Sequence, residues 1–159
     1  MELLPANAEN LDEIYSVVQN TIRNVYPKYY ATGVVQFFCD LHSRENILRD
    51  IDCQNVFFIK VARRIVATGT FSANHITRVF VLPEYQRKGL GSFIFDEFER
   101  RILSQYESVE IDASLAACKI YENRNYKTIR HEVVNCSDGC ILAYEVMEKR
   151  CENCWFCSL

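Results

Sequence analysis

The sequence has few of the residues that form linkers and no segment long enough to cross a membrane. Its 159 residues include only five glycines and three prolines, and no stretch rich in glycine, proline and serine divides the chain. No repeat or low-complexity tract is present either, so we expect one domain, which at this length can bury its own core. No apolar run approaches the roughly 20 residues of a membrane-spanning helix, so no membrane partner is expected.

The chain also lacks a large charge of either sign and the features of a secreted protein. A formal net charge of -3 argues against nucleic-acid binding by the whole domain. The first residues, MELLPANAENLDEIY, have neither the basic start nor the long apolar core of a signal peptide. We therefore expect a cytoplasmic protein whose eight cysteines are mostly free thiols, because the cytosol keeps thiols reduced.

Helical patterns fill the first third of the sequence. Apolar residues at helical spacing over residues 11–25 predict a helix that Asn10 caps and Pro27 ends. Thr32 and Ser43 are placed to cap two further helices, which end near residue 51.

Strand patterns then alternate with helices. Residues 55–61, 63–72 and 75–82 are rich in β-formers, and the tight junction at Ala62 and Arg63 predicts a hairpin. The elements expected next are a helix over 93–103, a strand over 108–114, a helix over 115–124 and a hairpin over 126–147. The order β-α-α-β-β-β-α-β-α-β-β indicates an α/β fold with a mixed sheet covered by helices, not a repeating βαβ wind.

A turn containing two glycines joins the strand at 75–82 to the next helix. It reads QRKGLGS over residues 86–92. Backbone N–H groups at such a turn converge on a phosphate, and Arg87 and Lys88 add positive charge. The turn is neither a Walker loop nor a GxGxxG motif, so the alternative is an ordinary turn that uses glycine for its geometry.

Two motifs in this region resemble the GNAT acetyltransferase superfamily. Its signature, Q/R-x-x-G-x-G/A after a strand ending in Val-x-Pro, is matched by VLP at 81–83 and QRKGLG at 86–91. A second family motif, N-x-x-A-x-x-F-Y-x-x-x-G-F, is similar to SLAACKIYENRNY at 114–126, which keeps Ala117 and Tyr121. Asn125 replaces a glycine there, and Asn tolerates the left-handed conformation that ends a helix. The resemblance assigns residues 1–149 to a GNAT domain and leaves 150–159 as a cysteine-rich tail.

The resemblance implies a GNAT fold whose central sheet splays apart to admit acetyl-CoA. Amides of residues 86–92 would hold its pyrophosphate, and backbone groups of residues 79–81 would pair with its pantetheine arm and polarise the thioester carbonyl. The residues implied to contact acetyl-CoA are Val79, Phe80, Val81, Gln86, Arg87, Lys88, Gly89, Leu90, Gly91, Ser92, Ser114 and Tyr121.

The reaction implied is direct attack of a primary amine on the thioester, with no nucleophilic Ser or Cys. Tyr121 matches the family's usual acid for the leaving thiolate; the alternative is a tyrosine that only packs. Strand alternation puts His75 on the face of Val79, where it suits a general base; the alternative is a structural histidine. His131 and Glu110 are fallback bases, and a reaction without a protein base also stays open.

The acceptor is not identified by the sequence. Tyr26, Tyr29 and Tyr30 are expected to line its pocket, unless they only pack two helices onto the sheet. A small-molecule amine is favoured over a peptide or protein. The alternative function is a non-catalytic acyl-CoA-binding sensor, and the resemblance leaves a homodimer open.

The tail carries Cys151, Cys154 and Cys157 at the spacing of a zinc half-site. A fourth ligand would have to come from Cys136 or Cys140, and zinc sites normally combine two paired halves. Free thiols are therefore favoured over a metal, and the transfer reaction is expected to need none. A metal-dependent contact with a partner or a second copy is the remaining hypothesis for the tail.

Overall fold

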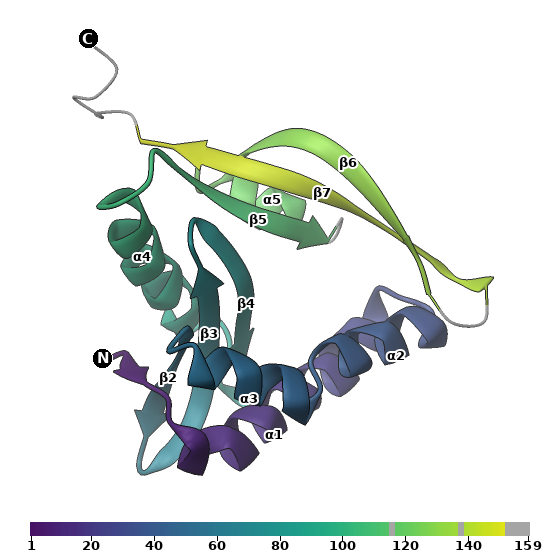
Figure 1. Ribbon diagram of the computed structural model, residues 1–159. Coiled ribbons are helices and arrows are strands. Elements are labelled where there is room, and N and C mark those ends of the chain that lie inside the picture. The colour runs from purple at the N-terminus through teal and green to yellow at the C-terminus, as the bar shows by residue number, and fades with distance from the viewer. Residues whose placement is uncertain (115–116, 137–138, 152–159) are drawn as a thin grey trace, which may run out of the picture.

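A seven-stranded sheet with helices packed against it makes up the computed structural model, which describes residues 1–114, 117–136 and 139–151 (Figure 1). The elements in chain order are β1 (Leu4–Pro5), η1 (Ala8–Asn10), α1 (Leu11–Val25), η2 (Tyr26–Lys28), α2 (Thr32–Leu41), α3 (Arg44–Asp52), β2 (Val56–Val61), β3 (Arg64–Ser72), β4 (His75–Val81), η3 (Pro83–Tyr85), α4 (Leu90–Leu103), β5 (Ser108–Ser114), α5 (Cys118–Glu122), β6 (Lys127–Asn135) and β7 (Ile141–Arg150). This order confirms the predicted mixed α/β fold.

The predicted helix caps are partly wrong. A 3-10 turn, η1, precedes α1, and the Asn7 side chain caps it by accepting from the Glu9 N–H at 2.9 Å. Asn10 instead reaches back to accept from the Asn7 N–H at 3.0 Å, so the cap lies one turn earlier than expected. Thr32 is the first residue of α2 rather than its cap. Ser43 does cap α3, where its hydroxyl accepts from the Asn46 N–H at 3.3 Å.

The hairpin between β2 and β3 turns within two residues, as predicted. Val61 pairs with Arg64, so only Ala62 and Arg63 form the loop. Both have positive φ, 48° and 70°, which is the geometry that suits the twist of a two-residue hairpin.

The strand order is β1-β2-β3-β4-β5-β7-β6, and β4 and β5 form a parallel pair. Only His75 with Glu110 and Ile76 with Ile111 are in register between them. Beyond these residues β5 follows β7, β4 follows β3, and Figure 1 shows the two halves of the sheet diverging. The predicted splay of the central sheet is therefore present.

Helix α4 packs tightly on one face of the sheet and α3 lies over the other. A Cβ added at Gly69 on β3 would lie 2.6 Å from Ile94 and Phe98 of α4, so only glycine allows this approach. Arg78 of β4 projects to the opposite face, where it pairs with Asp50 of α3. The close approach holds the first turn of α4 beside the open end of β4.

The last strand of the sheet continues into the first residue expected to form the tail. Strand β7 runs on to Arg150, the first residue of the expected tail, and the Cys151 N–H donates to the Glu107 carbonyl at 2.9 Å. Among the described residues, no helix combines the length and apolar character needed to cross a membrane.

Candidate active site

Two cavities meet where β4 and β5 separate. The first, named here the loop cavity, has a volume of about 470 Å³. Its lining residues are Thr21, Val25, Tyr26, Tyr29, Tyr30, Val79, Phe80, Val81, Tyr85, Gln86, Arg87, Gly89, Leu90, Gly91, Ser92, Phe95, Ser114, Ala117, Ile120, Tyr121 and Arg124.

The second, the hairpin cavity, has a volume of about 340 Å³ and lies between α2 and the β6–β7 hairpin. Its lining residues are Tyr26, Phe37, Phe38, Leu41, His42, Thr77, Arg78, Val79, Phe80, Asp112, Ser114, Ala117, Tyr121, Val134, Leu142 and Tyr144. The cavities share six residues, and Tyr121 is one of them.

The turn before α4 has the geometry of an anion site. Arg87 and Gly89 have positive φ, 58° and 82°, and Gly89 is the N-cap of α4. Since glycine has no side chain, its cap leaves the first amides of the helix available to a ligand. The first turn of α4 carries no acidic residue, and Arg87 lines the cavity. These features fit a phosphate group.

Gln86 and Lys88 belong to the same turn, but only Gln86 lines the loop cavity. The Gln86 side chain donates to the Val81 carbonyl at 3.0 Å, as does the Thr21 hydroxyl at 3.2 Å, so the turn is tied to the end of β4. Lys88 does not line the cavity. Its ammonium donates to the Glu84 carbonyl at 2.8 Å and lies 4.8 Å from the centre of the Tyr85 ring.

Arg124 is a cationic residue of the loop cavity that the sequence analysis did not identify. It follows α5, and its guanidinium pairs with Asp96 at 2.5 Å and with Glu99 at 3.0 Å. It falls at a variable position of the second motif, so the motif carries no signal for it. The exposed side chain of Ile120 lies in the same cavity and offers an apolar contact to a ligand.

Tyr121 lies between the two cavities. Its ring packs against Phe95 and Tyr126, with ring centres 5.5 Å and 6.0 Å away. Burial raises the pKa of its hydroxyl to about 12. The hydroxyl is therefore protonated at neutral pH and can donate a hydrogen bond or a proton.

The three tyrosines that are predicted to line the acceptor pocket do not all line the same cavities. Tyr26 lines both cavities, whereas Tyr29 and Tyr30 line only the loop cavity. The Tyr30 hydroxyl is buried without a hydrogen-bond partner among the described residues. A buried hydroxyl normally has a partner, so a ligand in the loop cavity would supply what Tyr30 lacks.

His75 does not share a face with Val79 as predicted, because β4 contains a β-bulge. Val79 pairs with Gly69, and His75 pairs with Ser72. Gly69 and Ser72 are three residues apart on β3 and so face opposite sides of the sheet. Cross-strand partners share a face, so His75 and Val79 lie on opposite faces.

None of the three candidate bases lines either cavity. His75 Nε2 lies 3.5 Å from Oδ2 of Asp112, which does line the hairpin cavity, but it makes no hydrogen bond with any described residue. Glu110 is in register with His75 at the closed end of the splay. His131 lies on β6 with its side chain 77% exposed, 3.8 Å from Glu145.

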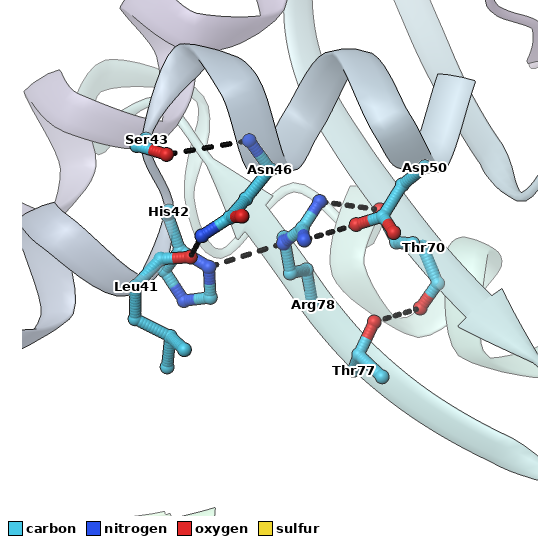
Figure 2. Close-up of polar contacts among 8 residues, drawn as sticks. All are labelled: Leu41, His42, Ser43, Asn46, Asp50, Thr70, Thr77 and Arg78. Carbon is cyan, nitrogen blue, oxygen red and sulfur yellow. Dashed lines mark hydrogen bonds and ion pairs between the residues drawn. The ribbon is translucent and has the colours of Figure 1, made fainter. Parts of the chain in front are cut away.

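A buried polar network borders the hairpin cavity (Figure 2). Arg78 donates through Nε to Nδ1 of His42 at 3.0 Å and through Nη1 to the Thr70 hydroxyl at 3.4 Å, and it forms an ion pair with Asp50. Burial and the adjacent charge of Arg78 lower the pKa of His42 to about 3. His42 is therefore neutral near pH 7.

This pKa predicts that the protein loses stability in acid. Unfolded His42, with a pKa near 6.5, binds a proton below that pH while the folded residue does not, so the free energy of unfolding falls as pH drops from 6.5 toward 3. We expect His42 to contribute a loss of about 2 to 3 kcal/mol between pH 7 and pH 4. Urea unfolding of the wild type and of His42→Gln at both pH values measures it.

His42→Gln should remove most of this pH dependence, because glutamine does not titrate. The carboxylates lose stability in the same range, so the quantity compared is the difference between the two proteins. An identical loss in both would contradict the expected role of His42.

The cysteines of the described chain form no metal site. No group of three or more His, Cys, Asp or Glu side chains in residues 1–114, 117–136 and 139–151 is arranged to hold a metal ion. Cys136, Cys140 and Cys151 are free thiols. Cys154 and Cys157 lie outside the described residues, so the zinc hypothesis for the tail stays a prediction.

Comparison with known proteins identifies a domain family. A family model for the acetyltransferase (GNAT) domain matches residues 25–148. A comparison with curated protein sequences finds no match.

Solved structures share the fold over nearly the whole chain. A GCN5-related N-acetyltransferase from Rhodopseudomonas palustris superposes with a TM-score of 0.85 at 18% identity, over 94% of this chain and 95% of the other. The PaiA N-acetyltransferase from Thermoplasma acidophilum, solved in complex with coenzyme A, gives 0.72 at 16% identity, over 94% and 98%. A ribosomal-protein-alanine N-acetyltransferase from Brucella melitensis gives 0.71 at 11% identity, over 95% and 100%.

Proposed function

The chain belongs to the GNAT acetyltransferase family, and on that premise we propose that it is an N-acetyltransferase that moves an acetyl group from acetyl-CoA to a primary amine. The observation that carries the proposal is the position of Tyr121, a protonated phenol where the loop cavity meets the hairpin cavity. A group-transfer enzyme needs two ligands that meet at one point, and these cavities offer that arrangement.

Acetyl-CoA fits the loop cavity by the chemistry of its lining. The free amides at the start of α4 and the guanidinium groups of Arg87 and Arg124 suit the phosphates. Ile120 suits an apolar part of the ligand, and the Tyr30 hydroxyl gains a partner. Lys88 is oriented away, so we assign it no contact.

Acetyl-CoA supplies an activated thioester, which a neutral amine can attack directly. Main-chain groups of residues 77–81, which have no strand partner on the β5 side, are available to orient the pantetheine arm and the thioester carbonyl. Tyr121 holds its proton at Oη and donates it to the departing sulfur; Ser114 also lines both cavities.

The amine would enter through the hairpin cavity. Asp112 is placed to hold the incoming ammonium there, and His75 lies behind it as a route for the proton that the amine must lose. Tyr26 contributes an aromatic wall. A volume of about 340 Å³ suits a small molecule or one terminal residue of a peptide, and we favour the small molecule.

Product detection by mass spectrometry tests the reaction. Purified protein and acetyl-CoA would be incubated with a mixed panel of amino acids, amino amides, aralkylamines, polyamines, aminoglycosides and peptides. A product that gains one acetyl group is expected. Acetyl-CoA that binds tightly and is recovered intact with every amine would reject the enzyme in favour of an acyl-CoA-binding sensor.

The cellular context of the reaction is proposed from the sequence alone. We propose a cytoplasmic protein that works as a monomer or a homodimer. Neither nucleic acid nor a membrane is part of this proposal.

A further inference from the structure

The contact between Arg78 and His42 determines which nitrogen of the histidine carries its proton. A guanidinium can only donate, so Nδ1 of His42, which receives the Arg78 Nε–H at 3.0 Å, must be the acceptor nitrogen. The low pKa of His42 means that the ring holds one proton. That proton is therefore on Nε2, and the ring presents a neutral N–H donor.

The donor belongs to a residue of the hairpin cavity. His42 is one of the residues that line that cavity, and Figure 2 shows its second ring nitrogen pointing away from Arg78. Nε2 has no hydrogen-bond partner among the residues that the structure describes. A ligand oxygen in the cavity would complete the hydrogen bonding of the ring.

The ring is held rigidly before any ligand arrives. It contacts Phe80 and Phe38, with ring centres 5.3 Å and 6.5 Å away. The Gln19 side chain donates to the His42 carbonyl at 3.1 Å, which fixes the main chain at the end of α2. A donor held in one orientation loses little entropy when it binds an oxygen.

The charges around the cavity limit what the rest of the ligand can be. Asp112 is the only carboxylate among the described residues that line it. A second ammonium on the same ligand would therefore have no acidic partner there. The walls formed by Phe37, Phe38 and Leu142 favour an apolar or aromatic body.

We propose that His42 selects the acceptor, because its Nε2–H binds a carbonyl or carboxylate oxygen on an amine that also carries an apolar or aromatic body. This inference rests on the proposed function and names the substrate class of the same site: an amino amide or amino acid rather than a polyamine or aminoglycoside. His42 binds the acceptor and takes no part in proton transfer.

Three matched probes test this recognition. Phenylalanine amide carries a carbonyl oxygen, phenylalanine a carboxylate, and phenethylamine neither. Affinities for the CoA-loaded protein, measured by calorimetry, and kcat/KM for acetylation would be compared. We expect the wild type to prefer at least one of the oxygen-bearing probes over phenethylamine by about 5- to 10-fold, the worth of one hydrogen bond. Which of the two it prefers separates the amide from the acid.

His42→Phe should abolish that preference, and His42→Gln, which can donate from the same region, should keep part of it. A purely structural role would weaken all three probes equally. A second measurement uses the unmodified protein: the imidazole N–H signal of His42 in a nitrogen–proton NMR spectrum should shift with phenylalanine amide or phenylalanine and not with phenethylamine. This signal keeps the test decisive if His42→Phe does not fold.

Binding and turnover together distinguish this inference from the proposed reaction. Equal affinities for all three probes in the wild type, an unchanged preference in folded His42→Phe, or no binding of any probe overturns the recognition by His42, even if acetylation occurs. A clear preference in binding with no acetylated product supports the recognition and contradicts the reaction.

Discussion

Replacing Tyr121 with phenylalanine is expected to lower kcat by about 10²- to 10⁴-fold, the usual contribution of a general acid. The phenol is buried where the two cavities meet, and burial raises its pKa to about 12. It is therefore protonated at neutral pH and can act as an acid. Phenylalanine keeps the ring contacts with Phe95 and Tyr126 and removes only the hydroxyl. The affinity for CoA should therefore change by a few-fold at most.

The measurement is single-turnover acetylation, followed by mass spectrometry, beside CoA binding by calorimetry. Tyr106→Phe is the matched control, because this tyrosine is exposed and lines neither cavity. If Tyr121→Phe and Tyr106→Phe both turn over at the wild-type rate, Tyr121 only packs. Loss of CoA binding in Tyr121→Phe would instead assign the hydroxyl to the cofactor.

The fold was largely predictable because its signals are local. The helical spacing over residues 11–25, the turn at Ala62 and Arg63 and the glycines near residue 90 each act within a few positions of the chain. The splay between β4 and β5 followed from the family resemblance and not from any local pattern. It is nevertheless present in the register, which stops at Ile76 and Ile111.

The face of His75 could not be predicted, because a β-bulge depends on how two strands fit together. The alternation rule uses the sequence of β4 alone. The extra residue, Thr77, is recognised only from the pairing with β3, where Thr70 and Phe71 have no partner for it. One inserted residue reverses the face of everything before it. The proposed route from the acceptor to His75 through Asp112 depends on this reversal.

The polar network at the hairpin cavity was hidden for a different reason. His42 and Asp50 lie 36 and 28 residues from Arg78, on segments that no motif connects. The one local sign is an arginine within the apolar strand β4, HITRVFV, since a charge in such a strand needs a partner. Which residue pairs with Arg78 depends on how α3 packs over the sheet.

The largest effect on stability is expected from Glu99→Ala, which should lower the free energy of unfolding by about 3 to 5 kcal/mol. Glu99 of α4 is buried and accepts hydrogen bonds from Arg124 at 3.0 Å, Tyr126 at 3.1 Å and Lys149 at 2.7 Å. Alanine leaves the two cations and the phenol without this partner in a largely buried position. Urea unfolding at pH 7 measures the change.

Glu97→Ala is the matched control on the same helix. Glu97 pairs with Arg100 and Arg101 within one turn, and solvent-exposed pairs of this kind contribute little to stability. Equal effects of the two substitutions would contradict the role of burial in the Glu99 cluster. Because Arg124 also lines the loop cavity, Glu99→Ala should weaken CoA binding as well, whereas Glu97→Ala should not. A structural carboxylate on α4 would in this way position a cation for the cofactor, linking the core of the fold to its proposed reaction.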